Sequence, residues 1–317
     1  MTPAARLGAY CVVLGVALVG GAAVGNAVGP FNTTSAASHA SHDAPGAATD
    51  SPPQDAPEEN LIPAGLTTSE AGYTLEPERT DLAGATGDAP FRFRITSPDG
   101  EVVRAFESRH ERELHLIVVD RDLTTFSHLH PTRADDGTWS VVLGKMKPGV
   151  HRAFADFVPS GGPDLTLGVD LAVAGDFRPA PLPSVAGTDA ADGYEVTLGG
   201  APTAGSSSEV TLEVSRDGQP VTDLDPYLGA NGHLVAIRAG DLAYLHVHPL
   251  ETTGKDSGPT VRFAVEVPSP GTYRLFFDFA HGTGVHTADF TVDVSSGDVT
   301  TDSGNDTEGH GANHEED

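Results

Sequence analysis

The chain has 317 residues and carries 18 basic against 45 acidic side chains, a formal net charge of −27 at pH 7. At about 150 residues per domain, this length predicts about two domains. A surface this negative repels nucleic-acid phosphates and anionic lipid headgroups, so we expect neither a nucleic-acid partner nor a polybasic membrane patch. Metal cations are compatible with it. The single cysteine, Cys11, excludes an intramolecular disulfide, an iron–sulfur cluster and a Cys-based zinc site.

The N-terminal segment predicts a membrane anchor. Residues 7–28 contain no charged side chain, and a helix of this length, at about 1.5 Å per residue, spans the roughly 30 Å hydrocarbon core of a bilayer. Arg6 precedes the segment and the next basic residue is Arg79, so the positive-inside rule puts the N-terminus in the cytoplasm and the bulk of the chain outside. We therefore assign residues 1–30 to a single-pass anchor in the cell membrane. The alternative is a signal peptide cut after Ala27, which makes the protein secreted.

Two segments of biased composition flank the folded region. Residues 31–64 are dominated by Ala, Ser, Thr, Pro, Asp and Glu, and residues 296–317 are acidic and rich in glycine. Neither segment carries the apolar pattern of a core, so we expect a disordered linker and a disordered acidic tail.

Between these segments the sequence repeats itself. ELHLIVVDRDLTTFSHLHP at 113–131 matches NGHLVAIRAGDLAYLHVHP at 231–249, and PGVHRAFADF at 148–157 matches PGTYRLFFDF at 270–279. Several matches in one order predict two copies of one domain. We place the copies at 65–176 and 191–295, joined by a Pro-rich linker at 177–190.

Each copy is predicted to contain seven short strands separated by glycine-rich and proline-rich turn signals. In the second copy the expected strands are 194–198, 209–214, 233–238, 243–248, 261–267, 273–279 and 288–294. Seven short strands in about 100 residues are typical of an immunoglobulin-like sandwich. The expected fold class is therefore all-β, with two tandem immunoglobulin-like β-sandwich domains after an N-terminal transmembrane helix.

An HxHP motif preceded by a third histidine occurs in both copies. The third histidine lies 13 residues before the motif in each case. Residues i and i+2 of a strand share a face, so the two histidines of each motif are expected to project together. If His115 pairs with His128 across a hairpin, and Ile117 with Phe126, three imidazoles share one patch. The sequence thus predicts one metal site per copy, with the candidate ligands His115, His128 and His130 in the first and His233, His246 and His248 in the second.

The ligand type narrows the choice of metal. Imidazole suits Cu(II) and zinc, and we expect Cu(II) first and zinc second. A methionine-rich Cu(I) carrier is disfavoured because Met146 is the only methionine besides Met1. Asp156 and Asp278, in the two matching DF pairs, are candidates for orienting a ligand imidazole. The alternative interpretation is that the histidines are structural, bonded to backbone carbonyls at the end of a strand.

The HL, DL and HxHP elements, followed by PG…R…F.DF, resemble a little-characterised group of bacterial, notably actinobacterial, envelope proteins. These have an N-terminal membrane segment and immunoglobulin-like domains. The resemblance implies an association with copper or heavy-metal handling, and it assigns no ligand to any residue of this chain.

Taken together, these features predict a membrane-tethered extracytoplasmic protein that binds Cu(II) or zinc through its histidines. Its expected partners are the membrane, the metal ion and another envelope protein. The alternative is a non-catalytic structural or interaction module of the cell envelope. No enzyme is expected, because the sequence contains no GxSxG, HExxH or CxxC motif and no Gly-rich phosphate loop.

Overall fold

The computed structural model describes residues 63–82, 88–245, 247–250 and 257–296, and these residues form β-strands and connecting loops without any helix. The predicted membrane segment, the tail and His246 lie outside the described residues. In the part that the structure describes, no helix has the length and hydropathy needed to cross a bilayer.

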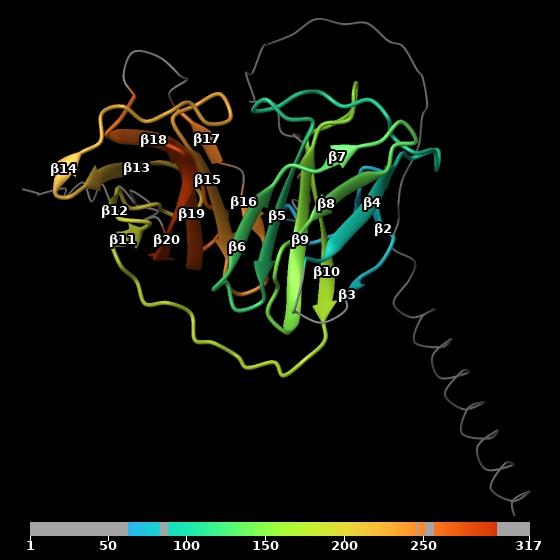
Figure 1. The fold of residues 1–317 in the computed structure, drawn as a ribbon, viewed down its shortest axis with the longest axis horizontal. Helices are drawn as coiled ribbons and strands as arrows, with labels where there is room; N and C mark the ends of the chain where they lie inside the picture. The colour runs from blue at the N-terminus through green and yellow to red at the C-terminus, as the bar shows by residue number, and fades with distance from the viewer. Residues whose placement is uncertain (1–62, 83–87, 246, 251–256, 297–317) are drawn as a thin grey trace, which may run out of the picture. The chain divides into compact units, whose positions relative to one another are not determined.

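The first repeat is a sandwich of two five-stranded sheets (Figure 1). We call the two sheets of each repeat outer and inner, the inner one being the sheet that contacts the other repeat. The outer sheet has the order β1 (Ser69–Glu70), β2 (Tyr73–Pro77), β4 (Pro90–Thr96), β8 (Trp139–Val142) and β7 (Thr132–Arg133). The inner sheet has the order β3 (Asp81–Leu82), β10 (Leu165–Val173), β9 (Gly149–Phe157), β5 (Leu114–Asp120) and β6 (Phe126–Leu129).

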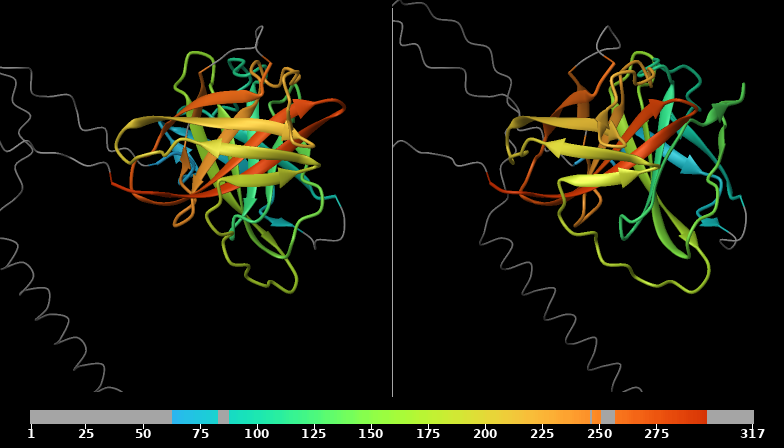
Figure 2. Two further views of the ribbon diagram at one scale, coloured as in Figure 1. Left: turned by 90° about the vertical axis from the view of Figure 1, so that its left-hand side faces the viewer. Right: turned by 60° about the vertical axis from the view of Figure 1, so that its left-hand side comes forward.

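The second repeat has the same architecture, and Figure 2 shows it from the side of its outer sheet. Its outer sheet has the order β11 (Thr188–Ala191), β12 (Tyr194–Gly199), β13 (Ser207–Arg216), β18 (Thr260–Glu266) and β17 (Val247–Pro249), with β14 (Gln219–Pro220) also paired to β13. Its inner sheet has the order β16 (Tyr244–Leu245), β15 (His233–Arg238), β19 (Gly271–His281) and β20 (Gly284–Val294). The two-sheet strand order in both repeats is that of immunoglobulin-like sandwiches, which confirms the predicted fold class for the described residues.

The outer sheets have one buried and one exposed face. Strand β4, for example, alternates between exposed residues and the buried Phe91, Phe93 and Ile95. This alternation of polar and apolar residues is expected of a sheet with one face in water. The buried side chains fill a separate core in each repeat, around Trp139 and Phe93 in the first and around Phe263 and Phe277 in the second.

The inner sheets are buried on both faces. On β5, Leu116 and Val118 point into the core of the first repeat, whereas Ile117 and Val119 belong to a third core shared with the second repeat. The inter-repeat core consists of Ile117, Val119, Leu123, Phe154, Val235, Ile237, Leu242, Tyr244 and Phe276. Uninterrupted apolar runs such as LIVV in β5 are therefore explained by the covering of both faces of the strand.

Two predictions about local strand structure are wrong. Strand β6 pairs Ile117 with His128 and Val119 with Phe126, a shift of two residues from the expected register. Strand β6 also ends at Leu129, so His130 follows the strand instead of continuing it. The connection is two residues longer than the expected register requires, because residues 120–125 separate the paired Val119 and Phe126. Within it Leu123 adopts a positive φ of 54° and its N–H donates to the carbonyl of Asp120.

The predicted strand at 243–248 is divided between two sheets. Tyr244 and Leu245 pair with β15 of the inner sheet, whereas residues from Val247 to Pro249 pair with β18 of the outer sheet. The chain thus passes from one sheet to the other within the second HxHP motif, and His248 belongs to the outer sheet.

The inter-repeat core predicts that the two repeats unfold as one cooperative unit. Phe276 stacks on Phe126 of the other repeat with ring centroids 4.4 Å apart. Replacing Phe276 by Ala should cost about 3–5 kcal/mol, because the cavity lies where both repeats need to pack. Urea unfolding with Phe177→Ala, whose ring is half exposed, as the size-matched control measures this. Equal losses for the two variants, or two separate transitions in the wild type, contradict the prediction.

Candidate metal centre

The inter-repeat face of the inner sheets changes from apolar to polar at one end. His115 lies on β5 two residues before Ile117, and His233 lies on β15 two residues before Val235. Because alternate strand residues share a face, both histidines point to the same side as the inter-repeat core. Their rings stack with centroids 5.7 Å apart and an angle of 6° between the planes.

A third histidine reaches the same place from β6 and is oriented by the opposite repeat. His128 Nδ1 lies 2.9 Å from Asp278 Oδ2, and these two side chains are 3% and 2% exposed. Asp278 also accepts a hydrogen bond of 2.6 Å from the Thr287 hydroxyl. The carboxylate of the second repeat therefore fixes the imidazole of the first, as carboxylates do for metal-ligating histidines.

The hydrogen bonds determine where the protons of two imidazoles lie. His115 Nε2 is 3.1 Å from the carbonyl oxygen of Arg109, which can only accept, so this nitrogen carries the proton. His128 Nδ1 faces a carboxylate and also donates. In their neutral forms both rings then present an unprotonated nitrogen to each other, His115 Nδ1 and His128 Nε2, at a distance of 3.0 Å. Two facing lone pairs repel, so a cation between or beside them would stabilise the arrangement.

A proton or a metal ion can supply this charge. A proton satisfies the pair of facing nitrogens and nothing else. Two further buried nitrogens, His130 Nε2 and His233 Nδ1, have no hydrogen-bond partner among the described residues. Leaving a buried polar atom unpaired costs about 1–3 kcal/mol. A metal ion uses several of these nitrogens at once, and one nitrogen from each of His115, His128 and His233 lies within 4.8 Å of the others.

We call His115, His128, His130 and His233 the histidine cluster, and burial opposes protonation of three of its members. Burial lowers the pKa of His115 to about 3 and that of His130 to about 4. Burial also lowers the pKa of His233, and the other histidines add to this effect. Neutral imidazole is the form that coordinates metal, so the surroundings keep the ligands in the binding form.

The structure places the six predicted ligands as follows. His115 and His128 of the first repeat meet His233 of the second in one group of facing nitrogens. His130 lies beside them, with ring centroids 5.1 Å from His115 and 4.9 Å from His128. His248 is not in the group and lines an adjacent cavity, while His246 lies outside the described residues. Four of the five described candidates, all except His248, thus lie in one composite group instead of the expected separate group in each repeat.

Two neighbours of the cluster differ from the sequence-based expectation. Asp278 orients a histidine as predicted but does so across the repeats, and Asp156 instead accepts a hydrogen bond of 3.1 Å from Thr166. His110 was not predicted at all, although its ring lies 6.1 Å from His115 and 6.0 Å from His233. His110 belongs to no repeated motif, so the only feature of the sequence that could have pointed to it is its position five residues before His115.

Comparison with protein families agrees with the tandem architecture. A family model described as a domain of unknown function, DUF8832, matches residues 68–175 and 189–296. The chain is therefore a tandem β-sandwich protein, and it belongs to the DUF8832 family, with two copies of the domain. No curated protein matches it.

Several solved structures match the chain at low similarity. InvD of Yersinia pseudotuberculosis is 14% identical over 72% of this chain and 59% of that chain, with a TM-score of 0.24. This chain therefore spans less than two thirds of the InvD structure. The D0–D1 domain of intimin is 12% identical over 70% of this chain and 97% of that chain, with a TM-score of 0.21. At these values the likeness says nothing about ligands or activity.

The metal-free protein should lose stability in acid. The unfolded chain takes up a proton on His115 near pH 6.5, whereas the folded chain resists it down to about pH 3. The resulting loss in the free energy of unfolding is absent above about pH 6.5, grows as the pH falls, and reaches about 2 kcal/mol at pH 5. Urea unfolding of metal-free wild type and His115→Gln at pH 7 and pH 5 isolates this contribution. A wild-type loss no larger than that of the variant means that the facing histidines already hold a proton.

Proposed function

We propose that this chain is a membrane-tethered, extracytoplasmic metal-binding protein that holds one ion between its two repeats. The observation that carries the proposal is the pair of facing unprotonated nitrogens on His115 and His128, next to two buried nitrogens that lack partners. The tether and the location outside the cytoplasm come from the N-terminal sequence and from the resemblance to actinobacterial envelope proteins.

Cu(II) is the metal that these ligands favour, and zinc is the second choice. All candidate donors are imidazole nitrogens, and Cu(II) leads the order of affinities for such sites. We propose binding, buffering or transfer of the ion, with another envelope protein as partner, and not catalysis.

A second function fits one specific observation. A single shared proton completes an unbroken chain of hydrogen bonds from Asp278 through His128 and His115 to the Arg109 carbonyl. In that case the histidines brace the two repeats, and the chain is a structural or interaction module of the envelope.

Metal titration separates the two functions. Because ligands come from both repeats, we expect the wild type to bind one Cu(II) per chain, and both His128→Asn and His233→Asn to abolish binding. His286→Asn is the control, since that ring bonds Asp192 away from the cluster. The protein should lack a histidine tag and carry Asn at His39, His42, His310 and His314, so that terminal histidines do not contribute. Binding at two independent sites contradicts the proposal. So does a dissociation constant weaker than about 10 μM, where 1 μM corresponds to a binding free energy of about 8.2 kcal/mol.

Asp278 should tune the affinity of the site without being a ligand. Replacing it by Asn removes the charge that orients His128, and the expected loss of Cu(II) affinity is about 10- to 100-fold with unchanged stoichiometry. Asp293→Asn is the matched control, because Asp293 likewise accepts a hydrogen bond from a threonine, Thr272, but lies on an exposed surface. Isothermal calorimetry measures both variants, and equal affinities mean that Asp278 does not act on the metal.

A further inference from the structure

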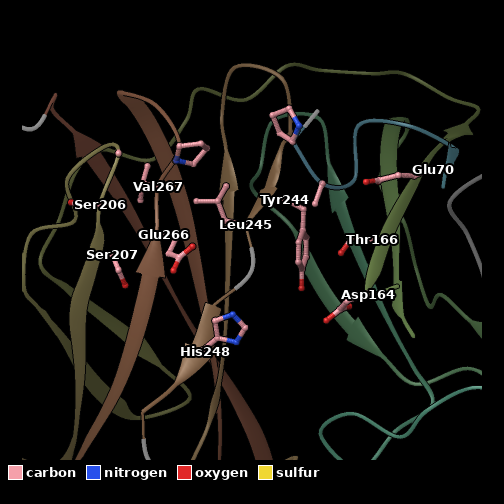
Figure 3. A pocket seen from close by; sticks show the side chains of 14 residues that line it. Glu70, Asp164, Thr166, Ser206, Ser207, Tyr244, Leu245, His248, Glu266 and Val267 are labelled. Atoms are coloured by element: carbon pink, nitrogen blue, oxygen red, sulfur yellow. The ribbon is translucent and has the colours of Figure 1, made fainter. Parts of the chain in front are cut away.

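A large cavity opens between the repeats beside the histidine cluster. Its volume is about 620 Å³, and it is lined by residues of both repeats. Figure 3 shows Glu70, Thr166 and Asp164 along one wall and Glu266, Ser207 and His248 along the other. We call this cavity the vestibule.

The vestibule is negatively charged. Three carboxylates line it, those of Glu70, Asp164 and Glu266, and no lysine or arginine is among the described residues that do so. A concave surface lined by charges of one sign focuses the field and raises the local concentration of the opposite ion. On a chain with a net charge of −27 this effect adds to the attraction exerted by the rest of the surface.

The vestibule connects to the histidine cluster through shared residues. Asp164, Tyr244 and His248 line both the vestibule and the smaller cavity of about 160 Å³. The smaller cavity is lined in turn by His115 and His233. The buried Nδ1 of His233 has no hydrogen-bond partner in the part of the chain that the structure describes, so the inner end of this path offers an unused ligand atom.

We propose that the vestibule takes up a divalent cation from solvent and passes it to the histidine cluster through Asp164 and His248. This inference rests on the proposed metal-binding function. Carboxylate oxygens favour hard, hydrated cations, whereas imidazoles hold Cu(II) or zinc more tightly. An ion therefore moves from weaker oxygen ligands at the mouth to stronger nitrogen ligands inside. His248, at the junction of the two cavities, acts as a transient ligand, which explains why it lies outside the group of facing nitrogens.

The test is the rate of metal uptake, measured by stopped-flow mixing of the full-length protein with Cu(II). A triple variant, Glu70→Gln, Asp164→Asn and Glu266→Gln, should take up Cu(II) at least about 10-fold more slowly at low salt. Its stoichiometry should stay at one ion per chain, and its rate should depend less on salt than that of the wild type. His248→Asn should also slow uptake, without removing the site.

The control carries the same change of charge elsewhere. Asp99→Asn, Glu101→Gln and Glu195→Gln alter three exposed residues that line neither cavity, and uptake should keep its wild-type rate. Circular dichroism and melting temperature confirm that every variant is folded.

The outcomes distinguish this inference from the function on which it rests. If the wild type binds one ion but the triple variant takes it up as fast as the control, the proposed role of the vestibule in uptake is wrong, whereas the proposed metal centre is still supported. If the triple variant loses its ion at equilibrium, the carboxylates are permanent ligands and the uptake path is wrong. If the wild type binds no ion, both proposals fail.

Discussion

The contact between the two inner sheets is the constraint on which the rest of the structure depends. Each inner sheet packs on its own sandwich core with one face and on the other repeat with its second face. An isolated repeat would therefore expose apolar side chains on the second face of its inner sheet. The contact is close to symmetric: Phe126 stacks on Phe276, and Tyr244, which is equivalent to Phe126, packs on Phe154, which is equivalent to Phe276. An interface that uses the same patch on both partners is typical of two-fold dimers, and here it occurs within one chain.

This symmetry explains why the candidate ligands of the two repeats gather in one place. In a two-fold arrangement, equivalent residues near the axis meet each other, as the stacked rings of His115 and His233 do. A motif present twice then contributes to one shared group instead of two separate ones. The apolar packing beside the group matters as well. Burial in low-dielectric surroundings makes a proton on an imidazole costly, which leaves the nitrogens available to a metal ion.

The sequence predicts the fold well because the signals for it are local. Strand periodicity, turn residues and the duplication gave the two sandwiches, and the expected strand at 233–238 matches β15. The site was predicted only in part. His115, His128, His130, His233 and Asp278 were among the candidates, but spacing within one repeat says nothing about which faces of two repeats meet. Uninterrupted apolar runs, such as those within Leu114–Asp120 and His233–Arg238, were the sequence signal for sheets covered on both sides.

The two repeats differ in the groups that hold their histidines, and this difference affects how the proposed site would hold an ion. Both repeats form a two-residue turn before the inner sheet, at His110–Glu111 and at Leu228–Gly229, with positive φ at both positions. In the first repeat Arg109, at the base of this turn, supplies the carbonyl that holds His115, and the second repeat supplies the carboxylate that holds His128.

His233 shows the consequence of this divergence, because no such group holds its Nδ1. In the proposed metal centre, two ligands are therefore oriented by hydrogen bonds before an ion binds, whereas the ring of His233 is positioned by packing against His115 and His128. Ligands that are ordered in advance lower the entropic cost of binding.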